Sequence, residues 1–252
     1  MPRGNAPHQC FQIRHSPFQV LRIYLPLTDQ SSAVVEQFVE HTVRRSVCLL
    51  YTSFWYGTKN GLCRYDGNTF EIFESLIQDT TSISGNSIYA LFEDSRKTLW
   101  AATNNGVCKY VRRFNNFHTI SGSSAVRAFA ELADGTILVA TSQGVRKLDI
   151  DADMLVDFGT DTGNYVTAPA FSIVEDSVGE IWVATIAGIC VIDPKNGTVR
   201  KYKHITHDAR SLPSNDISTI FRDSDDKLWI GTRSSGICRY DSRTDSFVRM
   251  SG

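Results

Sequence analysis

The residues best suited to bind a metal or move a proton are two histidines in the segment KHITHD. His204 and His207 lie three residues apart, and Asp208 follows the second one directly. Groups at this spacing can share a metal ion, but a stable site needs three or four ligands. No equivalent point of the chain offers a matching His or Cys cluster, so we predict no metal site and interpret both histidines as solvated loop residues. His118 is expected at the surface of an outer strand.

Paired carboxylates are the second candidates for acid–base chemistry. They recur at Glu93-Asp94, Glu175-Asp176 and Asp223–Asp226. A catalytic carboxylate is more often unique to one unit, whereas a carboxylate that recurs serves the turn of each unit. The chain also has no Gly-rich phosphate loop, no nucleophile elbow and no metalloprotease motif. The sequence therefore predicts no catalytic residue and no cofactor.

Both sets of residues belong to a repeat that organises most of the chain. Its fullest copy is Lys227–Asp241 (KLWIGTRSSGICRYD), with an aromatic residue, a small-residue dipeptide, a glycine-bearing turn and a second apolar run. Equivalent positions fall at spacings of 45, 38, 44 and 47 residues, namely Trp55, Trp100, Leu138, Trp182 and Trp229. A period in the low forties that carries strands is typical of propeller blades. We predict an all-β, incomplete propeller of about four to five four-stranded blades, a fragment of a larger array.

Each unit is expected to contain four strands, with an acidic or glycine-containing turn before the tryptophan strand. In the second unit, Asn105-Gly106 is expected to supply the positive-φ positions of the next hairpin. The tryptophan can wedge between neighbouring sheets, burying on the order of 150–250 Å². The connections Gln78–Asn86 and His207–Asn215 share one layout, which local side-chain hydrogen bonds explain without a ligand. The expected units are 54–75, 87–120, 125–158, 168–204 and 214–250.

Residues 1–53 do not follow the repeat. Ser31–Arg45 has apolar residues at near-helical spacing and predicts a short amphipathic helix, and Ser46–Thr52 predicts a strand. The acidic turn that precedes the tryptophan in other units is missing before Trp55. We interpret 1–53 as an aberrant or non-native segment, such as a frameshift or assembly artefact would produce. A genuine but divergent N-terminal cap is the alternative.

Composition and charge argue against several classes of function. With 26 basic and 27 acidic residues, the net charge of -1 gives no electrostatic basis for binding nucleic acid or an anionic membrane. We expect no transmembrane helix, because no window approaches ~18 consecutive apolar residues. Residues 1–23 lack the uninterrupted apolar stretch of a secretory signal. The sequence predicts a chain that does not contact a membrane by itself.

The six cysteines do not form a predicted disulfide framework. Four of them occupy one slot of the repeat, at Cys63, Cys108, Cys190 and Cys238. Equivalent slots on different blades are too far apart for a bond that needs Cα atoms within ~7 Å. We interpret these thiols as small apolar residues on inner strands. Cys10 and Cys48 lie in the aberrant N-terminal segment.

The repeat resembles a known family over roughly residues 54–252. Units with an acidic turn, LWIGT, a glycine and a basic-Tyr-Asp ending are similar to two-component regulator propeller repeats, which build the sensor regions of bacterial hybrid histidine kinases. The resemblance is carried by Glu93-Asp94, Leu99-Trp100, Thr103 and Gly106; by Glu175-Asp176, Trp182, Thr185 and Gly188; by Trp229–Thr232, Gly236 and Arg239–Asp241; and by Trp55, Gly57-Thr58 and Gly61–Asp66.

The resemblance implies a function that composition does not. Such sensor regions usually lie in the periplasm and comprise two seven-bladed propellers and a small β-sandwich, followed by a membrane helix, a kinase and receiver modules. Similar sensors respond to oligosaccharides. The implied partners are an oligosaccharide ligand, the remaining blades and kinase modules of the parent protein, and a second copy in a homodimer. The sequence shows no signal peptide, further blades, sandwich, membrane helix or kinase motif.

Ligand-binding residues are not determined by the repeat. Tyr56, Tyr165, Phe171 and Arg233 are non-repeating or variably placed near blade ends, where aromatic rings can stack on sugars, although packing or ordinary surface explains each equally well. The main hypothesis is a non-catalytic sensor fragment. The alternatives are a protein-interaction scaffold and a metal-dependent propeller lyase or hydrolase of the streptogramin-lyase type that uses His204 and His207.

Overall fold

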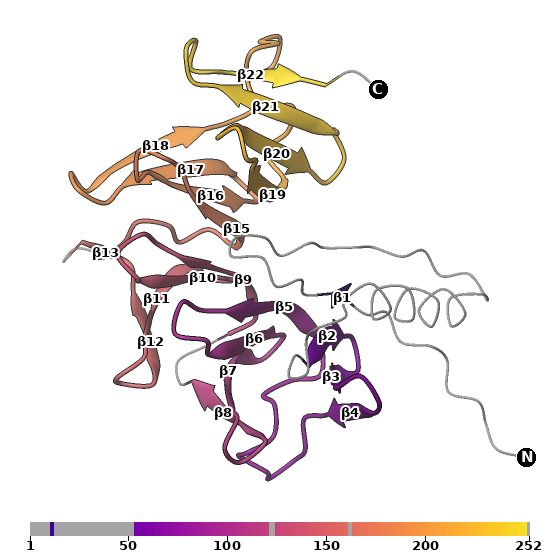
Figure 1. Ribbon diagram of the computed structural model, residues 1–252. Helices are drawn as coiled ribbons and strands as arrows, with labels where there is room; N and C mark the ends of the chain where they lie inside the picture. Colours follow the sequence, from indigo (N-terminus) through magenta and orange to yellow (C-terminus); the bar gives the residue numbers. More distant parts are fainter. Residues whose placement is uncertain (1–10, 13–52, 121–123, 161–162, 251–252) are drawn as a thin grey trace, which may run out of the picture.

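A computed structural model describes residues 11–12, 53–120, 124–160 and 163–250 (Figure 1). Within these residues the chain forms five four-stranded antiparallel sheets, each with its strands in chain order from one edge to the other. The all-β prediction is confirmed. The predicted helix at 31–45 and strand at 46–52 lie outside the described residues, as do Cys10 and Cys48.

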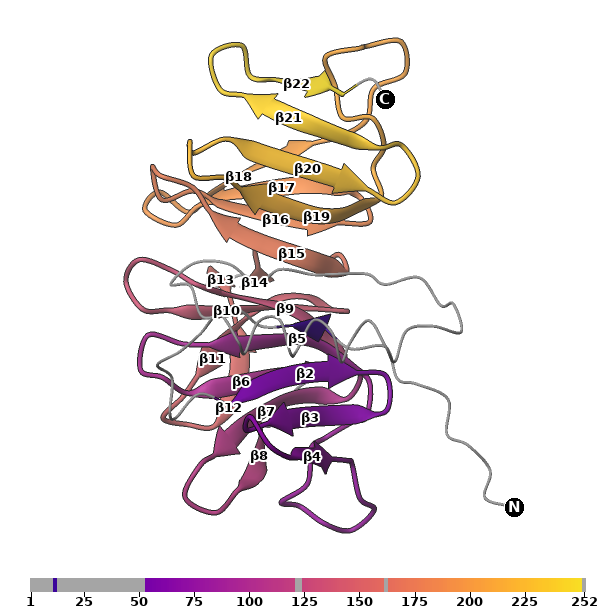
Figure 2. The ribbon, with the colours of Figure 1, turned by 45° about the vertical axis from the view of Figure 1, so that its right-hand side comes forward.

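The sheets follow one another along the chain and fan out side by side (Figures 1 and 2). The first sheet contains β1 (Phe11–Gln12), β2 (Phe54–Thr58), β3 (Gly61–Tyr65) and β4 (Phe70–Phe73). The second contains β5 (Ile88–Glu93), β6 (Leu99–Thr103), β7 (Gly106–Val111) and β8 (Asn116–Ile120). The third contains β9 (Val126–Glu131), β10 (Ile137–Thr141), β11 (Gly144–Asp149) and β12 (Met154–Asp157).

The last two sheets repeat the same order. The fourth contains β15 (Ala170–Glu175), β16 (Ile181–Thr185), β17 (Gly188–Asp193) and β18 (Thr198–Tyr202). The fifth contains β19 (Ile217–Arg222), β20 (Leu228–Thr232), β21 (Ile237–Asp241) and β22 (Ser246–Arg249). A separate short hairpin, β13 (Gly159–Thr160) with β14 (Gly163–Asn164), lies between the third and fourth sheets in the chain.

The first strands lie side by side along one edge of the array. β5 contacts β9, β9 contacts β15, and β15 contacts β19. In the first sheet this place is taken by β1, whose backbone pairs Phe11 with Gly57 and Gln12 with Tyr56 on β2. The described sheets form an open arc of blades. The prediction of an incomplete propeller is confirmed.

A carboxylate and a tryptophan fix the first turn of most sheets. In the second sheet Asp94 accepts hydrogen bonds from the Thr98 amide at 2.8 Å and from Trp100 Nε1 at 2.9 Å. Asp176 makes the same pair of bonds with Glu180 and Trp182, and Asp223 makes them with Lys227 and Trp229. The recurring carboxylates therefore hold the turn and orient the indole. In the third sheet Leu132 and Leu138 replace both groups.

The second hairpin of each sheet is closed by a threonine. Thr103 Oγ1 accepts from the Asn105 amide at 3.0 Å and donates to the Gly106 carbonyl at 3.1 Å. The expectation that both Asn105 and Gly106 have positive φ was wrong for Asn105. Only Gly106 does, at 115°, because the turn residues are Asn104 and Asn105 and the glycine already begins β7.

Apolar side chains fill the spaces between neighbouring sheets. Trp100 is 0% exposed and packs in one cluster with residues of the third sheet such as Val139 and Leu148. Trp182 is 1% exposed and packs with Ile217 and Leu228 of the fifth sheet. Trp100 and Trp182 thus fill the space between their own sheet and the next one, as predicted.

The cysteines lie elsewhere in the blades than expected. Cys63, Cys108, Cys190 and Cys238 are on β3, β7, β17 and β21, the third strand of the first, second, fourth and fifth sheets, rather than on the innermost strand. All four are free thiols, and burial raises the pKa of each. They are small, buried or half-buried residues two strands away from the inner edge.

Candidate functional site on the first strands

A β-bulge at the second residue of each first strand sets up the candidate site. In the ladders with the second strands, pairing passes from Ile88 to Ala90, from Val126 to Ala128, from Ala170 to Ser172 and from Ile217 to Thr219. The skipped residues are Tyr89, Arg127, Phe171 and Ser218. A bulge re-aims the side chain that it releases and is over-represented next to active sites. Four sheets therefore present a released side chain at the same end of their inner strands.

Three of these side chains and one neighbour form a continuous row of cations and aromatic rings. The Arg127 guanidinium carbon lies 4.2 Å from the centre of the Tyr89 ring and 5.9 Å from the centre of the Phe171 ring. On the far side of Phe171, the Arg233 guanidinium carbon lies 4.7 Å from the ring centre. We call Tyr89, Arg127, Phe171 and Arg233 the cation–aromatic row; it spans the second to the fifth sheet.

An ion pair anchors the end of the row. Arg233, just after β20, donates from Nε to Asp216 Oδ1 at 3.0 Å, and its amide donates to the Asp216 carbonyl. Each cation–π contact at a partly exposed site contributes about 0.5–1 kcal/mol. Tyr89, Arg127 and Phe171 are half-buried and Arg233 is exposed. The row is thus partly ordered before any ligand arrives, yet remains open to solvent.

The row has the chemistry of a binding site for a polar, ring-shaped ligand. Aromatic faces give apolar contact to the C–H faces of such a ring, while guanidinium groups donate hydrogen bonds to hydroxyl or carboxylate oxygens. The row contains no nucleophile–base pair, so its chemistry favours binding.

The structure brings together two of the four residues named from the sequence. Phe171 and Arg233 are in direct contact in the row. Tyr56 lies on β2 opposite Cys63, and Tyr165 packs edge-on against Phe158 with ring centres 5.3 Å apart, so neither belongs to the row. Tyr89 and Arg127 were missed. The second residue of each first strand, compared across units, is the signal that could have found them.

The two loop histidines differ in burial and in backbone conformation. His204 is half-buried, and its Nδ1 lies 2.7 Å from the Leu212 carbonyl oxygen. His207 is exposed and has a φ of 67°, matching the φ of 72° at Gln78 in the equivalent loop. No group of three His, Cys, Asp or Glu side chains among the described residues could hold a metal ion. His118 lies exposed on β8, with Nε2 3.3 Å from Asp153 Oδ2.

The loops that contain these residues are built by local hydrogen bonds. Asn215 Oδ1 accepts from the His204 amide at 2.7 Å, and Asn86 Oδ1 accepts from the Ser75 amide at 2.6 Å. Ser211 and Ser82 likewise each accept from a backbone amide six residues earlier. The shared layout of the two connections thus has a structural cause, as predicted.

Comparison with known proteins identifies the repeat. Residues 82–105 and 211–234 match the model of the two component regulator propeller family, and both segments begin at the serine of the shared loop. Two segments of the chain thus match two-component regulator propeller repeats. A search of curated proteins found no significant match.

Solved propellers share the fold at low identity. The extracellular domain described as that of the hybrid two component system BT4673 of B. thetaiotaomicron superposes with a TM-score of 0.63, at 20% identity over 81% of this chain and 26% of that one. The corresponding domain of BT3049 superposes with a TM-score of 0.60, at 19% identity over 81% of this chain and 27% of that one. Virginiamycin B lyase from Staphylococcus aureus superposes with a TM-score of 0.55, at 16% identity over 79% of this chain and 66% of that one.

These comparisons show two matches to a propeller repeat and an all-β propeller fold. This chain spans about a quarter of the length of the two sensor domains. Those two domains are extracellular by description. Among the residues that the structure describes, no helix has the length and apolar character needed to cross a membrane.

Proposed function

We propose that this chain is part of the ligand-sensing propeller of a hybrid two-component histidine kinase, on the periplasmic side of the membrane, and that its ligand is an oligosaccharide. The family match of the repeat and the likeness to extracellular sensor domains support the sensor assignment. The single observation that carries the ligand assignment is the cation–aromatic row, which joins four sheets through contacts of 4.2, 5.9 and 4.7 Å.

Signalling through the row follows from its position. Each of its residues comes from a different sheet, so a ligand that contacts two of them stabilises one relative placement of those sheets. A ligand shifts an equilibrium only by its difference in affinity between the two states. Binding across sheets supplies such a difference in affinity. The resulting change in blade or dimer packing would then alter the activity of the kinase modules of the parent protein.

The role is one of binding rather than catalysis. A metal-dependent lyase that used His204 and His207 would need further ligands, and no group of three His, Cys, Asp or Glu side chains among the described residues could hold a metal ion. A lyase is therefore the weaker hypothesis, although propeller lyases share the fold. A protein-interaction scaffold is the remaining alternative.

Calorimetric titration with a panel of neutral oligosaccharides tests the proposal. We expect one or more to bind, and Phe171→Ala to weaken binding roughly tenfold by removing the central ring. Phe114→Ala is the matched control, because Phe114 is 65% exposed and lies outside the row. A flat response to every saccharide, or equal losses in the two variants, contradicts the proposal. A flat response together with a co-purifying protein partner favours the scaffold.

A further inference from the structure

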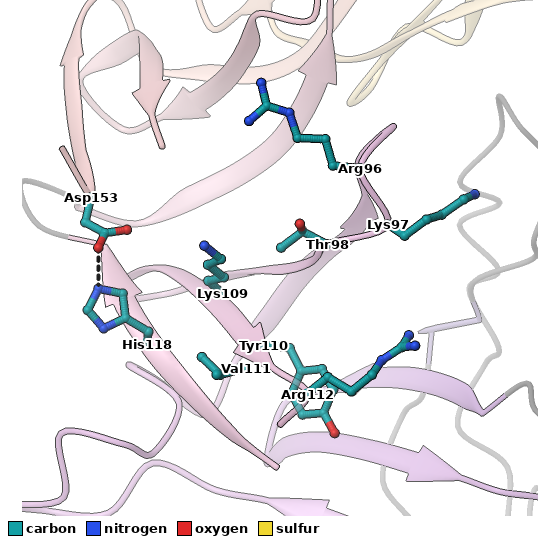
Figure 3. Close-up of a pocket in the computed structure, with 9 residues that line it drawn as sticks. All are labelled: Arg96, Lys97, Thr98, Lys109, Tyr110, Val111, Arg112, His118 and Asp153. Carbon is teal, nitrogen blue, oxygen red and sulfur yellow. Dashed lines mark ion pairs between the residues drawn. The ribbon is translucent and has the colours of Figure 1, made fainter. Parts of the chain in front are cut away.

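A hollow rich in positive charge lies at the end of the second sheet away from Tyr89. It has a volume of about 560 Å³ and is lined by residues from the first turn, from β7, from β8 and from the third sheet. We call it the basic groove, and its charged lining residues are Arg96, Lys97, Lys109, Arg112, His118 and Asp153 (Figure 3). Cavities of roughly 300–1,000 Å³ are the size that small-molecule ligands occupy.

The charge in this groove is far from the average of the chain. Four of the lining side chains are permanent cations, and Asp153 is the one carboxylate among the described lining residues, although the whole chain has a net charge of -1. Asp153 is directed at His118, with 3.3 Å between Oδ2 and Nε2 (Figure 3). A concentration of one sign of charge in a hollow raises the local concentration of ions of the opposite sign.

Little within the described part of the chain neutralises these cations. Lys97 Nζ lies 3.2 Å from Glu93 Oε1, and Lys109 Nζ lies 5.8 Å from the centre of the Trp100 ring. Arg96 and Arg112 form no ion pair with the residues that the structure describes. The two guanidinium groups therefore keep donors available to an anion.

The repeat does not explain these cations. Arg96 stands where the other units have Asp134, Val178 and Asp225, and Arg112 stands where they have Ile150, Pro194 and Ser242. A residue that only serves the blade would recur from sheet to sheet, as the turn carboxylates do. Positive charge at these two positions is specific to the second sheet.

The backbone at Lys97 is the second independent observation. Lys97 has a φ of 65°, and in the same turn position the other units have Gly135 at 84°, Gly179 at 87° and Asp226 at 64°. A left-handed conformation is unfavourable for a side chain with a Cβ. Two of the four turns nevertheless have a charged residue there, and the second sheet is the one in which that residue is a cation.

We propose that the basic groove binds an anionic saccharide, through its sulfate or carboxylate groups. Planar guanidinium groups match both oxyanions in a bidentate geometry, and Arg96 and Arg112 each supply one such group. The charged ends of Arg96, Lys97, Lys109 and Arg112 point in different directions, so each would meet a different oxyanion of one saccharide (Figure 3). The choice of a saccharide as carrier of the anion rests on the proposed function. The groove itself is separate from the cation–aromatic row, so the two sites can be tested independently.

Titration with sucrose octasulfate tests the proposal, with unmodified sucrose as the neutral control. We expect sucrose octasulfate to bind and sucrose not to bind in the groove. Arg96→Gln combined with Arg112→Gln should weaken binding roughly tenfold or more, since each arginine makes a charge-assisted hydrogen bond. Lys195→Gln combined with Arg243→Gln is the charge-matched control, because both side chains are exposed on other sheets. Binding should weaken as NaCl rises from about 50 mM to about 300 mM.

Three results would overturn the inference. If the groove variant and the charge-matched control lose the same affinity for sucrose octasulfate, the binding is general electrostatic attraction. If the unchanged protein does not bind sucrose octasulfate, the groove is not a binding site. Inositol hexakisphosphate binding as tightly as sucrose octasulfate would overturn the saccharide assignment. Phe171→Ala separates this inference from the proposed function: it should leave sucrose octasulfate binding unchanged while weakening binding of neutral oligosaccharides.

Discussion

Replacing Asp94 by alanine should destabilise the protein more than any other change to a first turn. The Asp94 carboxylate is 3% exposed and accepts two hydrogen bonds, at 2.8 Å from the Thr98 amide and at 2.9 Å from Trp100 Nε1. Trp100 is itself 0% exposed, so water cannot replace the carboxylate. A buried donor left without its partner costs about 1–3 kcal/mol, which gives about 2–6 kcal/mol for two fully buried donors. Thr98 is half-buried, so the expected loss lies in the lower part of that range, at about 2–4 kcal/mol.

The fifth sheet supplies a matched comparison with the same chemistry and less burial. Asp223 accepts from the Lys227 amide at 2.9 Å and from Trp229 Nε1 at 2.7 Å. Trp229 is only half-buried, because no described sheet packs against its face. Water can reach both donors in Asp223→Ala, so that variant should lose much less stability than Asp94→Ala.

Urea unfolding followed by tryptophan fluorescence measures both losses of unfolding free energy. The two losses can be compared if the slope of that free energy against urea concentration is the same in each variant as in the unchanged protein. The reasoning fails if Asp94→Ala loses less than about 1 kcal/mol, or if Asp223→Ala loses as much. The third sheet shows why the hydrogen bonds themselves are replaceable. There Leu132 and Leu138 replace the aspartate and the tryptophan, and the Thr136 amide donates to Asp134 Oδ1 at 2.8 Å instead.

Three further measurements test the packing, the strain and the titration of this fold. Lys97→Gly should raise the free energy of unfolding by up to about 1 kcal/mol by relieving its left-handed backbone, seen as a higher urea midpoint, while weakening sucrose octasulfate binding. Ile189→Asp, at a position 1% exposed, should prevent stable folding in a thermal melt, whereas Ile237→Asp, at the equivalent position 53% exposed, should leave the melting temperature almost unchanged. Burial raises the pKa of Cys238 from 9.0 to about 11, so the unfolded thiol ionises first. Stability should therefore be intact below pH 9 and fall as the pH rises toward about 11, and Cys238→Ala should flatten that fall in alkaline urea titrations.

The blades were predictable from the sequence because their determinants are local. The Asp–Trp turn and the Thr–Gly hairpin each involve residues within six positions of one another, as Asp94 with Trp100 and Thr103 with Gly106 show. Such contacts recur wherever the same short pattern recurs. The repeat therefore predicted four-stranded sheets and an incomplete propeller, and it correctly placed the tryptophan between neighbouring sheets.

The candidate sites were decided by the packing of one sheet on the next. Tyr89, Arg127 and Phe171 are about forty residues apart in the chain. Only the β-bulges of three separate ladders and the side-by-side first strands bring them into one row. The basic groove likewise joins the second sheet to Asp153 of the third. Neither arrangement has a local signature, because the contacts that form the row join side chains of different sheets.

Burial also depends on the neighbour rather than on the residue. Trp100 and Trp229 occupy the same slot and make the same hydrogen bond to aspartate, yet the first is 0% exposed and the second only half-buried. The sequence by itself determined that both tryptophans would project from their second strands. The tertiary structure decided which one is enclosed, because hydrophobic burial requires an opposing sheet and no single repeat carries one.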